Sequence, residues 1–112
     1  MLNITLYLLQ RVSAAMMVPF VLVHLVVMII AVNGGLTATE ILSRTQGSLV
    51  WMLFYGGFVI AVSIHAAIGV RVIAYEWFGL NGRWLSVFTW TVGALLLFTG
   101  LQAVHAVTAT PL

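Results

Sequence analysis

Three histidines are the side chains best suited to bind a metal in this 112-residue chain, because the sequence contains no cysteine. The lack of cysteine excludes disulfides, thiolate nucleophiles and cysteine-held iron–sulfur clusters. The only acidic side chains, Glu40 and Glu76, lie on separate segments and cannot work as a paired acid and base. We therefore expect any chemistry to come from a bound cofactor or a partner, with His24, His65 and His105 as the candidate ligands.

The composition indicates a protein that is embedded in membrane lipid. Hydrophobic residues make up 63% of the chain and charged residues only 5%, whereas a soluble domain has about 45–50% apolar and about 25% charged residues. Four arginines and two glutamates cannot solvate the surface of a water-soluble monomer. The net charge of +2 is not gathered into a basic cluster, which argues against a nucleic-acid partner.

Three apolar runs are long enough to cross a bilayer, which takes about 20 helical residues. They cover about residues 12–32, 49–75 and 84–107. Because they lack the alternation of barrel strands, they predict an all-α integral membrane protein with three transmembrane helices, forming a single domain over residues 1–112. The first run is longer than the apolar core of a signal peptide, so we expect a retained anchor.

The arginines predict how the chain is oriented. Arg11, Arg71 and Arg83 fall on one side of the membrane and Arg44 falls on the other, so the N-terminus is expected to be cytoplasmic. Glu40 and Arg44 have the spacing of a helical ion pair, which indicates a short helix in the first loop. We expect a multi-pass protein of the bacterial inner membrane rather than of the mitochondrial one.

His65 and Gly69 lie on one stripe of the second predicted helix, where a glycine would let a flat ligand approach the backbone. The alternative is a histidine that hydrogen-bonds to another helix, with the glycine serving only packing. Helical rise puts His65 about 9 Å inward from Arg71 and His24 about 20 Å inward from Arg11, a difference of about 11 Å. The two histidines should therefore not share one haem, and a bis-histidine haem would need its second ligand from another chain.

Two segments resemble a known family. Residues 8–15, LLQRVSAA, resemble the start of the first transmembrane helix in the cytochrome b anchor subunits of succinate:quinone oxidoreductase, that is, succinate dehydrogenase and its fumarate reductase relatives. Residues 65–77 resemble the second-helix signature of the same subunits. That signature has a haem-ligating histidine, a glycine four residues on, often an arginine two further, and an acidic-aromatic pair, which match His65, Gly69, Arg71 and Glu76-Trp77.

The resemblance implies a membrane subunit that binds haem b and helps to form a quinone site. His65 would be one axial ligand, and the other ligand would come from a second membrane anchor subunit. A flavoprotein subunit and an iron–sulfur subunit would dock on the cytoplasmic face, and electrons from succinate would pass through them to quinone. Arg11 would lie at the quinone pocket or near a haem propionate, and Glu76 and Trp77 would end that pocket.

The chain departs from the ubiquinone-type pattern at two positions. Tyr7 and Trp77 stand where those members have a serine and a tyrosine, although both can donate a hydrogen bond and are expected at the quinone site. His24 resembles the first-helix histidine of two-haem members, which binds the distal haem. We therefore expect one or two haems shared with the partner, and we favour two, with iron held by His65 and His24.

Other functions stay open at this point. The chain could be a cofactor-free structural anchor or assembly subunit whose histidines hydrogen-bond between helices, or a fumarate reductase anchor that works in the reverse direction. A small transporter component is disfavoured because the sequence shows no repeat and no broken helix. His105 is expected near the far membrane interface, where a solvated histidine is the favoured interpretation.

Overall fold

The computed structural model describes residues 3–109, and within them the chain is helical. It forms α1 (Ile4–Gly34), α2 (Ala38–Thr45), α3 (Leu49–Phe78) and α4 (Gly82–Thr108). The prediction of an all-α protein with three membrane-spanning helices is confirmed, because α1, α3 and α4 are each long and apolar enough to cross a bilayer. The described residues contain no strand.

The ends of the helices are set by local hydrogen bonds rather than by the apolar runs. α1 begins at Ile4, well before the apolar run, because the Asn3 side chain accepts a hydrogen bond from the Leu6 N–H at 2.9 Å. α3 extends to Phe78 and is capped by Gly79, whose φ of 67° is left-handed and favours glycine. Polar residues beyond the hydrocarbon are therefore part of the same continuous helices.

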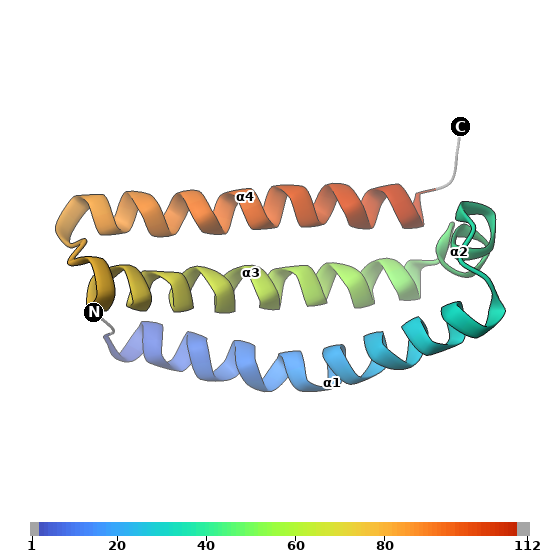
Figure 1. The fold of residues 1–112 in the computed structure, drawn as a ribbon, viewed down its shortest axis with the longest axis horizontal. Coiled ribbons are helices and arrows are strands. Elements are labelled where there is room, and N and C mark those ends of the chain that lie inside the picture. Colours follow the sequence, from blue (N-terminus) through green and yellow to red (C-terminus); the bar gives the residue numbers. More distant parts are fainter. Residues whose placement is uncertain (1–2, 110–112) are drawn as a thin grey trace.

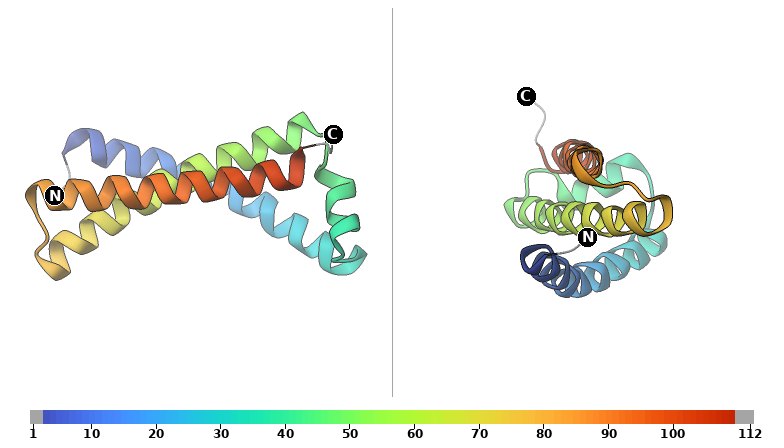
Figure 2. Two further views of the ribbon diagram at one scale, coloured as in Figure 1. Left: turned by 90° about the horizontal axis from the view of Figure 1, so that it is seen from above. Right: turned by 90° about the vertical axis from the view of Figure 1, so that its left-hand side faces the viewer.

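The three long helices form one layer with α3 in the middle. α1 and α4 pack on opposite sides of α3 (Figure 1). Seen from above, α1 and α3 cross as an X while α4 runs over them (Figure 2). The N-terminus and the α3–α4 turn lie at one end, which we call the N-terminal end of the bundle, and α2 lies at the other end (Figure 1).

The contact between α3 and α4 depends on small residues. A Cβ on Gly93 would lie 3.3 Å from the Ala67 Cβ, and one on Gly100 would lie only 2.5 Å from the Val59 Cγ1. Small residues let two helices approach closely in lipid, where apolar burial alone gives no driving force. The large apolar side chains of α1 and α4 are mostly exposed, as expected for surfaces that contact acyl chains.

Pro19 lies inside α1 and does not end it. A proline removes one backbone hydrogen bond from a helix and favours a bend. α1 is visibly bowed along its length (Figure 1), as its sequence indicates.

The first loop contains the short helix indicated by Glu40 and Arg44, and this helix, α2, is fixed to the end of α4. The Thr45 hydroxyl donates to the Val107 carbonyl at 2.6 Å, and the Gly47 N–H donates to the Thr108 carbonyl at 2.7 Å. α2 therefore fixes the loop against the bundle at the end opposite the N-terminus.

Candidate functional site

His65 lies on the face of α3 that meets α1. Phe58, seven residues earlier on the same stripe, packs on Phe20 of α1, and Gly69, one turn later, lies beside Gln10 of α1. The His65 ring is half-buried, and its Nδ1 is buried without a hydrogen-bond partner among residues 3–109. A buried polar atom without a partner is costly, and such an atom often marks a ligand site.

Gly69, one turn from His65, is not tightly packed against α1. A Cβ at Gly69 would meet only the Gln10 Nε2, at 3.7 Å, which is an ordinary contact. Gly69 therefore is not needed for close packing of α1 on α3 within this chain. A glycine that the contact of α1 with α3 does not require, one turn from an unpartnered imidazole, is compatible with a ligand edge beside α3.

Gln10 and Ser13 are polar residues of α1 on the side that meets α3 near Gly69, and neither was assigned a role from the sequence. Ser13 is only 4% exposed, and its hydroxyl donates to the Gln10 carbonyl at 3.1 Å. The Gln10 Oε1 is buried without a partner among the described residues. The sequence signal is a polar pair three residues apart at the start of an apolar helix, on the stripe that faces α3.

His24 lies in an aromatic cluster between α1 and α3. Its ring meets Phe58 edge-on at 5.6 Å between centroids and Tyr55 edge-on at 6.1 Å. Its Nδ1 is also buried without a hydrogen-bond partner in residues 3–109. Tyr55 was not singled out from the sequence, and its only signal was its place among the aromatic residues near the start of the second apolar run.

The two histidines lie at different levels of the bundle. His24 contacts Phe58, which precedes His65 by seven residues of α3, or about 10 Å of helical rise. Both axial nitrogens of one haem must bind the same iron, so His24 and His65 of one chain do not share a haem. Each histidine is instead available to a separate ligand.

Arg11 and Tyr7 lie together on α1, near the N-terminal end of the bundle. The guanidinium carbon of Arg11 lies 5.7 Å from the centre of the Tyr7 ring, a cation–π distance. Both side chains are exposed, so their polar groups are accessible from outside the chain.

Trp77 and Glu76 lie in the last turn of α3, at the same end as Arg11 and Tyr7. Trp77 is 78% exposed, so its ring points away from the bundle. The structure therefore brings these candidate quinone residues to one end of the bundle, on two neighbouring helices. His105 is at the opposite end, exposed in the last turn of α4, where a helix C-terminus favours a cation.

The described residues contain no group of three or more histidine, cysteine or acidic side chains that could hold a metal ion. A closed metal site built by residues 3–109 alone is therefore not part of the fold. His65 and His24 each offer one imidazole. A single imidazole suits haem iron whose second axial ligand comes from another chain.

A comparison with protein families gives one match. The family described as succinate dehydrogenase/fumarate reductase transmembrane subunit matches residues 2–101, nearly the whole chain. No curated protein and no solved structure reaches significant similarity to this chain. Together with the three membrane-spanning helices, this match identifies a multi-pass membrane subunit of an enzyme complex. The chain belongs to the succinate dehydrogenase/fumarate reductase transmembrane subunit family.

Proposed function

We propose that this chain is the haem b-binding membrane anchor of a succinate dehydrogenase. The observation that carries the proposal is the buried, unpartnered Nδ1 of His65, one turn before Gly69 in a helix that the bundle holds centrally. Haem b, when bound, takes up and releases single electrons. The protein's own part is to orient the imidazole and to keep water from it by burial between α1 and α3.

The second axial ligand of the His65 haem would come from a second membrane anchor subunit. His24 is about 10 Å away along the helix axis, too far to bind the same iron. His105 lies in the last turn of α4, at the opposite end of the bundle from Arg11 and Trp77. A partner helix would therefore lie beside the contact of α1 with α3, at the level of His65, and supply its own histidine.

His24 would hold a second haem, nearer the end of the bundle that carries α2. Its unpartnered Nδ1 supports a ligand role, and its ring is held by the edges of Tyr55 and Phe58. Aromatic contacts of this kind fix a ring's orientation without using its nitrogens. His24 would thus have a nitrogen free to bind iron.

Arg11, Tyr7 and Trp77 would form this chain's share of the quinone site. A guanidinium that stacks on a tyrosine ring keeps its N–H groups free to donate to a quinone carbonyl. Trp77, exposed at the end of α3, can donate through its indole N–H. The partner subunit and the iron–sulfur subunit would close the site over these exposed groups.

The N-terminal end of the bundle would face the cytoplasm and dock the iron–sulfur and flavoprotein subunits. Arg11, Arg71 and Arg83 support this orientation, because positively charged residues favour the cytoplasmic side. The bacterial inner membrane is the location that we propose. Electrons from succinate would then reach quinone close to Arg11, and succinate itself would bind to another subunit.

The direct test is the spectrum of His65→Ala in the purified complex. We expect the b-type absorbance of the haem near His65 to be lost while the chain still inserts and its partners still copurify. His105→Ala is the matched control, since His105 is an exposed histidine in the last turn of α4 and should keep the full spectrum. An unchanged spectrum in His65→Ala would refute the ligand role and favour a cofactor-free anchor.

A further inference from the structure

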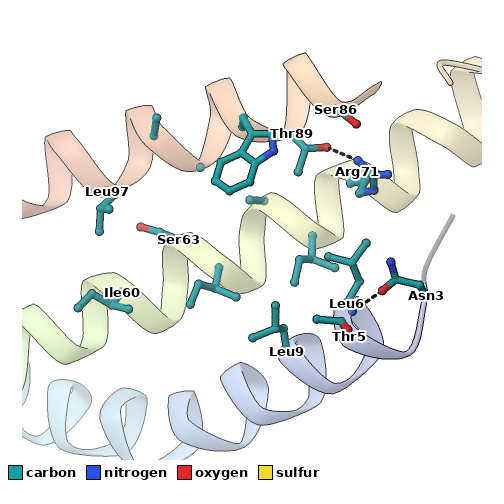
Figure 3. A pocket seen from close by; sticks show the side chains of 16 residues that line it. Asn3, Thr5, Leu6, Leu9, Ile60, Ser63, Arg71, Ser86, Thr89 and Leu97 are labelled. Atoms are coloured by element: carbon teal, nitrogen blue, oxygen red, sulfur yellow. Dashed lines mark hydrogen bonds between the residues drawn. The ribbon is translucent and has the colours of Figure 1, made fainter. Parts of the chain in front are cut away.

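A groove of about 750 Å³ opens on the side of α3 away from His65. It is lined by the start of α1, the middle of α3 and the first half of α4 (Figure 3). Arg71, which lines it, follows His65 by six residues and is therefore turned about 120° around the helix axis. Neither His65 nor Gly69 lines the groove, but their neighbours Ile64 and Ile68 do, so the groove adjoins the proposed haem site without containing its ligand.

The groove is apolar along most of its length and polar at the N-terminal end of the bundle. Leu97 and Ile60 lie toward its inner end, whereas Arg71, Ser86 and Thr89 lie toward its outer end (Figure 3). Its mainly apolar part, which also contains Ser63, runs from Arg71 back to Ile60, about 16 Å along α3. An elongated apolar slot with polar groups at one end suits an amphipathic chain molecule.

Arg71 has hydrogen-bonding capacity that the described residues do not use. Its Nη1 donates to the Thr89 hydroxyl at 3.3 Å, and that hydroxyl in turn donates to the Leu85 carbonyl at 2.8 Å. The Arg71 Nε is buried and has no hydrogen-bond partner in residues 3–109. A guanidinium carries five N–H donors, so an acceptor ligand could still be bound through several of them.

No acidic side chain of this chain neutralises Arg71. The sequence has only two acidic side chains, Glu40 and Glu76. Glu40 is in α2, at the other end of the bundle (Figure 1). Glu76 follows Arg71 by five residues, which turns it about 140° away around α3. A positive charge in the membrane without a counter-ion favours an anionic ligand.

Arg71 lies close to the boundary between the acyl chains and the lipid headgroups. α3 has 30 residues and is about 45 Å long, so it exceeds the hydrocarbon core of about 30 Å by about 7 Å at each end. Arg71 is seven residues before Phe78, or about 10 Å from the helix end, and a long side chain can reach outward from there. Its guanidinium can thus lie at the boundary between acyl chains and headgroups.

We propose that this groove binds one anionic membrane phospholipid. The phosphate accepts hydrogen bonds from the Arg71 guanidinium, and one acyl chain lies along the apolar part of the groove toward Ile60 and Leu97. Arginine suits this role because its planar donors match phosphate oxygens in pairs. The lipid fills the groove between α1 and α4 on this side of α3.

The test measures which phospholipid the purified complex retains. The complex is delipidated in detergent, given equal amounts of phosphatidylglycerol and phosphatidylcholine, and analysed by native mass spectrometry. We expect the unaltered complex to retain phosphatidylglycerol in preference. Arg71→Gln should lower that retention about tenfold, the effect of losing charge-assisted hydrogen bonds. Arg83→Gln is the matched control, because Arg83 is exposed at the same end and does not line the groove.

A second pair of variants tests the apolar part of the groove independently of charge. Ala94→Phe puts a large ring into the groove, whereas Leu95→Phe puts one on the neighbouring exposed surface that does not line it. We expect loss of the bound lipid only in Ala94→Phe. Equal retention in all variants would overturn the proposal. So would the loss of bound quinone, instead of phospholipid, from Arg71→Gln and Ala94→Phe.

Discussion

The imidazole of His24 meets the ring of Phe58 edge-on, with 5.6 Å between ring centroids and 69° between ring planes. Phe58 precedes His65 by seven residues on α3, so this one contact sets the axial distance between the two histidines at about 10 Å. The value agrees with the depth difference of about 11 Å expected from helical rise alone. The two histidines therefore lie at different depths in the membrane.

If both histidines bind haem, His24→Ala should lower the haem content of the complex to about half and leave the haem of His65 in place. The replacement removes the only imidazole at that level in the described part of the chain. A pyridine haemochrome assay, normalised to this chain, measures the content. A single haem per unaltered complex would remove the His24 assignment and leave that of His65 intact.

Arg11→Leu should lower quinone reduction by about tenfold or more, because a charge-assisted hydrogen bond to a carbonyl contributes about 1.5–3 kcal/mol. Succinate oxidation with an artificial dye, which needs only the soluble subunits, should keep its rate. Arg83→Leu is the control, since Arg83 is an exposed arginine at the same end of the bundle. Equal loss of both activities in Arg11→Leu would indicate an assembly role instead.

Gly100→Ala should destabilise the pairing of α3 with α4 by about 1–3 kcal/mol, the usual cost of overpacking. The new Cβ would lie 2.5 Å from the Val59 Cγ1, and a β-branched side chain has little freedom to move away. Gly56→Ala is the control, because a Cβ at Gly56 meets nothing within 4 Å.

The thermal unfolding midpoint in detergent measures the effect of Gly100→Ala. Adding Val59→Ala should restore much of the loss, because it removes both methyl groups that the new Cβ would meet. A Gly100→Ala midpoint equal to that of Gly56→Ala would mean that α3 and α4 are not in close contact here.

Thr45→Val should loosen the attachment of α2 to the end of α4, although the backbone hydrogen bond from Gly47 to Thr108 stays. It removes the hydrogen bond from the Thr45 hydroxyl to the Val107 carbonyl, at a cost of about 1 kcal/mol. Amide hydrogen exchange should become faster in α2 and stay unchanged in the middle of α3. Ser43→Ala is the matched control, because the Ser43 hydroxyl donates only within its own helix, to the Glu40 carbonyl. Similar amide exchange rates in α2 of the two variants would contradict a role of the Thr45 hydroxyl in holding α2 to α4.

The sequence by itself determined that the chain lies in a membrane, that it has three spanning helices, and that His65 and Gly69 share one stripe of the second of them. The length of an apolar run and the spacing of residues along it are local properties of the sequence. Because a bilayer has a fixed thickness, they are enough to predict which segments form spanning helices. α1 begins at Ile4, before the apolar run that predicted it. Its start is set by the hydrogen bond that the Asn3 side chain accepts, and hydropathy does not detect such a bond.

Only the tertiary structure decided which faces of these helices meet. The helices are apolar on all sides, so no amphipathic stripe indicates which face packs inward and which contacts lipid. The place of α3 between α1 and α4, the contact of Gln10 with Gly69, and the groove at Arg71 all depend on pairings between segments distant in sequence. Small residues set the contact of α3 with α4, and aromatic rings set that of α1 with α3; both act only once the helices are side by side.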